Sequence, residues 1–213
     1  MSLNKEFDQE KIKSIFSKMD EALSFRHQKL RLVAIGSSVL ILDGMPERGT
    51  ADIDIWKTSD SEGKWLTYLS DYCQIPLDPP YSENCPPHMS WVINDFIGLP
   101  EFHEWEKDSE IVWSGDFLTI IKPPVGVILG GKLAAWRAKD IRDIDWILDH
   151  HKNWKESLDY YYPLFDPHIK NQIDRNTFFF DLYLNARKSK IIDHPESEAS
   201  LILPQKSKQP KTS

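Results

Sequence analysis

The chain has 213 residues, of which 40% are apolar and 28% are charged, and its formal net charge at pH 7 is −7. This length suits one domain of ordinary size, or one domain with a small helical appendage, and the apolar content is sufficient for a packed core. The acidic balance excludes a general nucleic-acid binder, because such a protein needs a basic surface to neutralise phosphates. No apolar run has the length that a membrane span requires.

The two cysteines, Cys73 and Cys85, are predicted to be free thiols in a reducing cytoplasm, because no signal-peptide pattern precedes them. Cys85 lies near two histidines, His88 and His103. Their spacing lacks the second closely spaced pair of ligands that is typical of a zinc site, so a zinc protein is not expected.

The first 56 residues predict two helices and two strands. Apolar residues at helical spacing predict an amphipathic helix over residues 4–24. The apolar run Leu30–Ile35 predicts a core strand that ends at Gly36, followed by a helix over Ser37–Leu42. A loop rich in glycine and proline then leads into a second strand over residues 51–56.

Two acids, Asp52 and Asp54, are one residue apart inside that second strand, between the apolar residues Ile53 and Ile55. Side chains of a strand alternate between its faces, so both carboxylates are expected on the same face. Two neighbouring carboxylates repel each other unless a cation lies between them, and Mg²⁺ is commonly held by one or two carboxylates together with substrate phosphates. The alternative is a polar sheet edge on which both acids are solvated.

The whole arrangement, Gly36-Ser37-Ser38 and then Arg48-Gly49-Thr50-Ala51-Asp52-Ile53-Asp54, resembles the signature of the nucleotidyltransferase superfamily, the polymerase-β-like fold. The sequence from Arg48 to Asp54 resembles the motif of the AbiEii-like branch of this superfamily, which is known for toxin–antitoxin systems. The resemblance implies that Gly36, Ser37 and Ser38 bind nucleotide phosphates and that Asp52 and Asp54 hold metal. Arg48 either contributes to phosphate binding or holds the loop before the strand.

The middle of the chain predicts a helix over residues 59–69, a proline-rich irregular loop over 76–87 and a third strand over 90–96. Superfamily members often carry a third acid on a strand beside the acid pair, and Asp95 is the candidate here. Asn94 is the alternative occupant of that position, and Asp116, at the start of a later strand, is the other acid considered. A solvated strand end is the non-functional interpretation of Asp95.

A hairpin is expected around Ser114-Gly115, followed by a helix over residues 125–137 and another over 141–150. A second motif lies in these two helices and resembles the "K-x-x-A" and "R-x-K-D-x-x-D" patterns of the same family. Its matching residues are Lys132, Ala135, Arg137, Lys139, Asp140 and Asp143.

The resemblance implies that Lys132 and Asp140 lie at the active site, where Lys132 binds nucleotide phosphate and Asp140 either orients Lys132 or acts near the acceptor. Two structural interpretations stand beside it. Asp140 fits a helix N-cap, and Lys139 with Asp143 fits an ordinary ion pair one helical turn apart.

The region after residue 151 is aromatic and contains a helix expected over residues 174–188, beside a modest basic cluster (Arg175, Arg187, Lys188 and Lys190). That cluster fits either RNA binding or the solvated rim of an aromatic core. The predicted organisation is a nucleotidyltransferase-like domain over residues 1–150, a helical region over 151–195 and a disordered polar tail over 196–213.

The predicted fold is therefore α/β, a nucleotidyltransferase fold with a mixed central sheet flanked by helices and a small C-terminal helical region. The resemblance implies transfer of a nucleotidyl group from an NTP to RNA or protein with Mg²⁺ or Mn²⁺, in a toxin–antitoxin system with a cognate antitoxin. Two alternatives remain: a non-catalytic binding or antitoxin protein of the same fold, and an enzyme that modifies a small molecule.

Overall fold

A five-stranded sheet forms the centre of the computed structural model, which describes residues 6–46, 48–80, 82, 85–93 and 98–189. The strand order is β3-β2-β1-β5-β4. The strands are β1 (Leu30–Ile35), β2 (Asp52–Trp56), β3 (His88–Val92), β4 (Glu110–Ser114) and β5 (Leu118–Lys122).

The sheet is mixed. Strand β1 runs antiparallel to β2 and parallel to β5, β2 runs parallel to β3, and β4 and β5 form an antiparallel hairpin. The hairpin around Ser114-Gly115 and the α/β class with a mixed sheet are thus confirmed.

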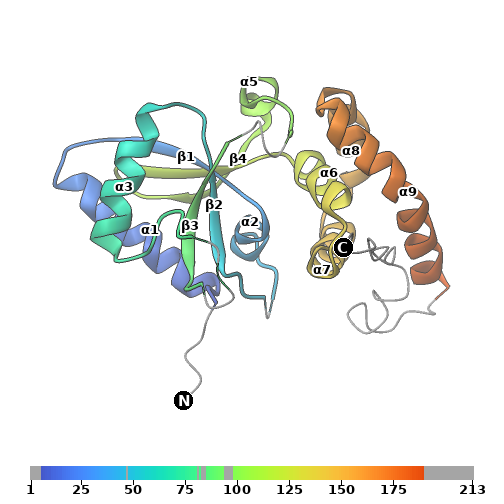
Figure 1. Ribbon diagram of the computed structural model, residues 1–213, viewed down its shortest axis with the longest axis horizontal. Coiled ribbons are helices and arrows are strands. Elements are labelled where there is room, and N and C mark those ends of the chain that lie inside the picture. Colours follow the sequence, from blue (N-terminus) through green and yellow to red (C-terminus); the bar gives the residue numbers. More distant parts are fainter. Residues whose placement is uncertain (1–5, 47, 81, 83–84, 94–97, 190–213) are drawn as a thin grey trace, which may run out of the picture.

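Helices cover both faces of this sheet (Figure 1). Helix α1 (Gln9–Ser24) packs against α3 (Ser61–Cys73) on one side, and the short helix α2 (Ser37–Leu42) lies on the other side with the C-terminal helices beyond it. A further short helix, α5 (Phe102–Trp105), and a 3-10 turn (Glu106–Asp108) lead into the hairpin.

Helix α6 (Val125–Ala135) contacts the three helices that follow it, α7 (Ala138–His150), α8 (Trp154–Tyr161) and α9 (Pro167–Lys188). A 3-10 turn (Tyr162–Leu164) joins α8 to α9. Helix α6 is buried on nearly every side, and close approach to its neighbours requires glycine: a Cβ at Gly126 would lie 2.3 Å from the backbone of Ser157.

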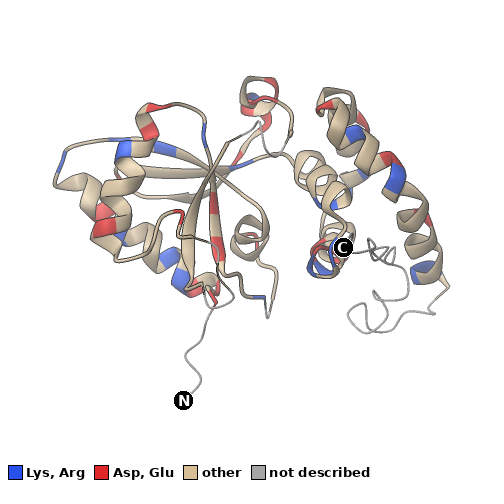
Figure 2. Cartoon of the chain, in the orientation of Figure 1, with Lys and Arg blue, Asp and Glu red and all other residues tan. Residues whose placement is uncertain are grey.

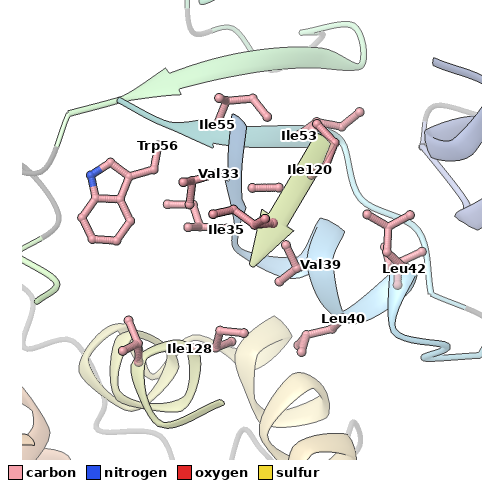
Figure 3. Packing of buried hydrophobic residues seen from close by; sticks show 14 of the residues in the cluster. Val33, Ile35, Val39, Leu40, Leu42, Ile53, Ile55, Trp56, Ile120 and Ile128 are labelled. Atoms are coloured by element: carbon pink, nitrogen blue, oxygen red, sulfur yellow. The ribbon is translucent and has the colours of Figure 1, made fainter. Parts of the chain in front are cut away.

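The core is continuous from the sheet into the helical region. Val33 and Ile35 of β1 pack beside Val39 of α2, and Ile128 of α6 faces the same apolar cluster (Figure 3). The N-terminal half and helix α6 therefore share one hydrophobic core, and this sharing fixes α6 against the end of β1.

Several element boundaries differ from the sequence predictions. Helix α1 begins at Gln9, because the Asp8 carboxylate accepts a hydrogen bond from the Lys11 N–H and caps the first turn. Helix α3 extends to Cys73, where Gln74 adopts a left-handed conformation. Strand β3 begins two residues earlier than expected, at His88, and ends at Val92.

The C-terminal helices also differ in extent. Helix α6 ends at Ala135, because Trp136 adopts a left-handed conformation (φ 42°), and α7 already begins at Ala138. Helix α9 begins at Pro167, seven residues before the predicted start, with Asp166 as its cap.

Among the described residues, no helix has both the length and the apolar character needed to cross a membrane.

Candidate functional site

The paired acids of β2 share one face of the sheet, as predicted. Asp52 and Asp54 are half-buried, whereas Ile53 between them is fully buried on the opposite face. In the register of the sheet Asp54 lies beside Ile35 of β1, and Asp52 lies beside His88 of β3. Figure 2 shows acidic residues in red along β2.

The Asp54 carboxylate points at the turn that follows β1. Gly36 adopts φ 74° and ψ −152°, a conformation that is essentially restricted to glycine. A Cβ at this position would lie only 2.7 Å from Asp54 Oδ2. The glycine therefore serves both the backbone conformation and the close approach of the acid.

The electrostatics of the pair favour a cation. Burial, together with the charge of Asp52, raises the pKa of Asp54 to about 6, against the opposing charges of Lys132, Lys139 and His88. Asp52 is oriented by Thr50, whose hydroxyl donates to Asp52 Oδ1 over 2.7 Å.

These carboxylates offer hard oxygen ligands on one face of the sheet, and they repel each other in the absence of a cation. Such a ligand set fits Mg²⁺ or Mn²⁺. Within the described ranges, no group of three His, Cys, Asp or Glu side chains is placed to hold a metal ion. The fit therefore rests on Asp52 and Asp54, with the remaining coordination positions left to water and substrate oxygens.

The Ser37 hydroxyl lies inside a buried ionic network. It donates to Asp143 Oδ2 over 2.7 Å and accepts from Lys132 Nζ at 3.0 Å and from Arg48 Nη2 at 3.3 Å. A hydroxyl has one donor and two acceptor positions, so all three are used. The Ser37 hydroxyl therefore has no hydrogen-bonding position left for a ligand, and a contact from Ser37 to a ligand would have to come from its backbone N–H.

Lys132 forms ion pairs with two acids of α7, Asp140 and Asp143. Its Nζ lies 2.5 Å from Asp143 Oδ2 and 3.2 Å from Asp140 Oδ1, and both carboxylates are fully buried. Arg48 adds a second cation, with Nε 3.1 Å from Asp143 Oδ1. The structure therefore brings Ser37, Arg48, Lys132 and Asp140 together within one network, in contact with the Gly-Ser turn.

The Asp140 carboxylate binds Arg137 as well as Lys132. Arg137 Nε and Nη2 donate to its two oxygens over 2.7 and 3.1 Å. Burial pushes the pKa of Asp140 upward, but the hydrogen bond from Arg137 and the charges of Lys132 and Arg137 hold it below its ordinary value.

The two structural interpretations of α7 need correction. Asp140 is not the N-cap: it is the third residue of the helix, and it accepts a hydrogen bond from the N–H of Arg137, which occupies the cap position. Asp143 forms ion pairs with Lys132 and Arg48 instead of an ordinary surface pair with Lys139.

Among the described residues, none of the candidates for a third acid lies beside Asp52 and Asp54. Asp95 and its alternative Asn94 lie outside the described residues. Asp116 lies in the β4–β5 turn, where its N–H donates to the Asp20 carboxylate of α1. Because Leu118 pairs with Leu30, at the opposite end of β1 from Gly36, Asp116 is remote from the acid pair.

Sequence reasoning did not single out three features of the site. Asp143 was within the second motif, but nothing in the sequence indicated that it would bond Ser37, which is 106 residues away. The bidentate contact of Arg137 depends on the helix boundary at Trp136. A cavity of about 290 Å³ also opens beside Gly36, between β1, α6 and α9.

A family model described as "Nucleotidyltransferase of unknown function (DUF6036)" matches residues 10–148. No curated protein and no solved structure matches the chain. The matched range contains both aspartates of β2, the Gly-Ser turn and the ionic network, and it ends before α8 and α9.

Proposed function

The chain belongs to the DUF6036 family of nucleotidyltransferases of unknown function, and we propose that it moves a nucleotidyl group from an NTP to an acceptor hydroxyl on RNA or protein. The observation that carries the proposal is the close approach of the Asp54 carboxylate to Gly36, because a metal ion held by Asp52 and Asp54 would then lie next to the turn proposed to bind phosphate. The architecture agrees with a nucleotidyltransferase fold.

The turn is the proposed phosphate site. The first N–H groups of a helix have no partner within the helix, so those of Ser37 and Ser38 are available to phosphate oxygens. The Ser37 side chain is already occupied, and its contacts to Lys132 and Arg48 keep the turn in place. These two cations add positive charge beneath the bound phosphates.

Asp52 and Asp54 would hold Mg²⁺ or Mn²⁺, which when bound neutralises phosphate charge. In the proposed reaction the acceptor oxygen forms a bond to the α-phosphorus, the bond from that phosphorus to the β-phosphate oxygen breaks, and pyrophosphate leaves. Asp95 is the proposed acceptor of the hydroxyl proton. Asp140 positions Lys132 through their 3.2 Å ion pair.

The resemblance to the AbiEii-like branch supports a narrower proposal, a cytoplasmic toxin–antitoxin component that meets a cognate antitoxin. The non-catalytic alternative, a binding or antitoxin protein, is favoured by one observation. Lys132 and Arg48 are both paired with Asp143, so their charges are partly neutralised before any substrate arrives.

The test uses the full chain with each alpha-labelled NTP, Mg²⁺ or Mn²⁺, and separate pools of RNA, protein and small-molecule acceptors. We expect label to enter one pool, and we expect the double variant Asp52→Ala with Asp54→Ala to abolish transfer. Transfer that survives in the double variant would remove the metal role. NTP binding without any transfer would support the non-catalytic alternative.

A further inference from the structure

A cavity of about 290 Å³ adjoins the proposed phosphate turn, and Gly36 and Lys132 lie in its wall. Helix α6 provides most of the remaining wall, through small or apolar residues such as Ile128 and Gly131. Helix α9 closes the cavity with Ile169 and Gln172. The cavity therefore lies between the catalytic half and the helical region that follows the family-matched range.

We propose that this cavity binds the nucleobase of the NTP, and that α9 supplies the residue that reads it. The inference rests on the proposed function, because the phosphates must lie at the Gly36 turn for the base to reach the cavity. The volume is at the lower end of the range of about 300–1,000 Å³ for small-molecule sites, which suits one ring system instead of a polymer segment.

The lining fits a planar ring. Apart from Lys132, the α6 residues that line the cavity are apolar or glycine, and a Cβ at Gly131 would meet only Leu99, at 3.2 Å. Arg137 lies at the cavity with a side chain that is 57% exposed. Its two hydrogen bonds to Asp140 fix the plane of the guanidinium, and a planar guanidinium in the cavity wall is suited to stacking on a base.

Gln172 is the neutral polar side chain of this lining. Its amide nitrogen lies 2.9 Å from His168 Nε2, one turn earlier on α9, and this contact leaves the amide oxygen as an acceptor. An amide oxygen at the edge of an apolar cavity favours a base that carries an exocyclic amino group, such as adenine or cytosine.

The first experiment separates the cavity from the phosphate site by using adenosine and tripolyphosphate as independent probes of the full chain. Ala135, at the end of α6, lines the cavity and is exposed, so Ala135→Trp covers the cavity without disturbing the core. Ala138→Trp, on the exposed start of α7 and outside the lining, is the matched control.

We expect Ala135→Trp to weaken adenosine binding by about tenfold or more, measured by ligand-observed NMR, because a ring would lose its desolvated surface. Tripolyphosphate binding in the presence of Mg²⁺ is expected to stay unchanged in that variant and to be lost in Asp52→Asn with Asp54→Asn. Adenosine binding that is equal in wild type, Ala135→Trp and Ala138→Trp, or absent in all three, would overturn the cavity assignment.

These probes also separate the two proposals. Tripolyphosphate binding that needs both aspartates, together with adenosine binding that is insensitive to Ala135→Trp, overturns only the cavity assignment. Adenosine binding that Ala135→Trp removes, in a protein that neither binds tripolyphosphate nor transfers label, overturns only the nucleotidyltransferase assignment.

A second experiment tests the reading residue with the four NTPs. Wild type is expected to prefer ATP or CTP over UTP by roughly three- to tenfold, the range of one net hydrogen bond, and Gln172→Leu is expected to remove that preference. Asn171→Leu, on the exposed neighbouring position of α9, is the control and should keep it. A preference that persists in Gln172→Leu, or a wild type that favours UTP, would overturn the role of Gln172.

Discussion

Asp54 is charged at neutral pH in surroundings that oppose its charge. Its pKa of about 6 lies above the ordinary value of an aspartate because the side chain is buried and faces Asp52. Between the two pKa values the folded protein binds a proton that the unfolded chain does not, so the contribution of this group to stability falls as pH rises toward 6. Above pH 6 the cost is complete, at roughly 2–3 kcal/mol.

The first prediction follows from this sign. Asp54→Asn should raise the free energy of unfolding of the metal-free protein at pH 8 by about 1–3 kcal/mol, and should have little effect at pH 4, where the acid is already neutral. Urea unfolding at both pH values measures the difference. Asp116→Asn, a change at an exposed acid in the β4–β5 turn, is the control, and an equal effect of Asp54→Asn at both pH values would contradict the argument.

The second prediction concerns the buried cation. Lys132→Met should destabilise the fold by about 3–5 kcal/mol, because it leaves two fully buried carboxylates without this partner. Combining it with Asp143→Asn should cost less than the sum of the single changes, since the second change removes an unpaired charge. Additive costs in thermal or urea unfolding would show that the two groups are not coupled.

The surface pair Lys155–Asp159 on α8 provides the matched control. Both of its side chains are about two-thirds exposed (65% and 64%), so Lys155→Met should change stability by less than about 1 kcal/mol. The comparison also shows how activity data on Lys132 must be read: a loss of transfer has to be separated from a loss of folded protein.

At the level of elements, the turn between β1 and α2 combines two constraints that can be tested separately. Gly36→Ala introduces backbone strain and a Cβ 2.7 Å from Asp54 Oδ2, whereas Gly44→Ala introduces positive-φ strain with nothing within 4 Å of the new atom. Both variants should lose about 1–3 kcal/mol of stability. Only Gly36→Ala should also weaken Mn²⁺ or Mg²⁺ binding, measured by calorimetry, and equal metal affinity in both variants would contradict the role of the close approach.

The sequence was a good guide to elements whose signal is local. The strand Leu30–Ile35 and the helix Ser37–Leu42 have the predicted bounds, because the apolar run ends at Gly36, and the turn there has a backbone conformation that favours glycine. The break between α6 and α7 was predicted two to three residues too late, because Trp136 in a left-handed conformation carries no sequence signature comparable to glycine.

Local side-chain patterning predicted the geometry of the candidate site only within a single strand, whereas the family resemblance named Ser37, Lys132 and Asp140 without giving their contacts. The shared face of Asp52 and Asp54 follows from the alternation of side chains along β2. The burial of Asp143 does not follow from its own helix, because its partners are on α6 and in the loop before β2. Such contacts depend on tertiary packing, and hydrophobic periodicity along the sequence carries no information about them.

At the scale of the whole molecule, helix α8 packs closely against α6. A Cβ at Gly126 would lie 2.3 Å from the Ser157 backbone, which cannot move without shifting α8. Gly126→Ala should therefore lower the free energy of unfolding by about 1–3 kcal/mol and increase proteolysis of the C-terminal helices.

Gly131→Ala on the same helix is the control for that change. Its new atom would meet only the end of the Leu99 side chain, at 3.2 Å, and alanine is the better helix former by about 1 kcal/mol. We expect its melting temperature to equal or exceed that of wild type. A similar loss in both variants would mean that close packing on α8 is not the cause.

The bond between Ser37 and Asp143 spans 106 positions of the chain. During synthesis on the ribosome, the glycine turn and both β2 aspartates emerge long before the segment that holds the turn in place. A nascent or prematurely terminated polypeptide that lacks α7 thus carries the motif without its anchor. The turn therefore gains this anchor only after α7 has been synthesised, so the order of biosynthesis delays the onset of any activity there.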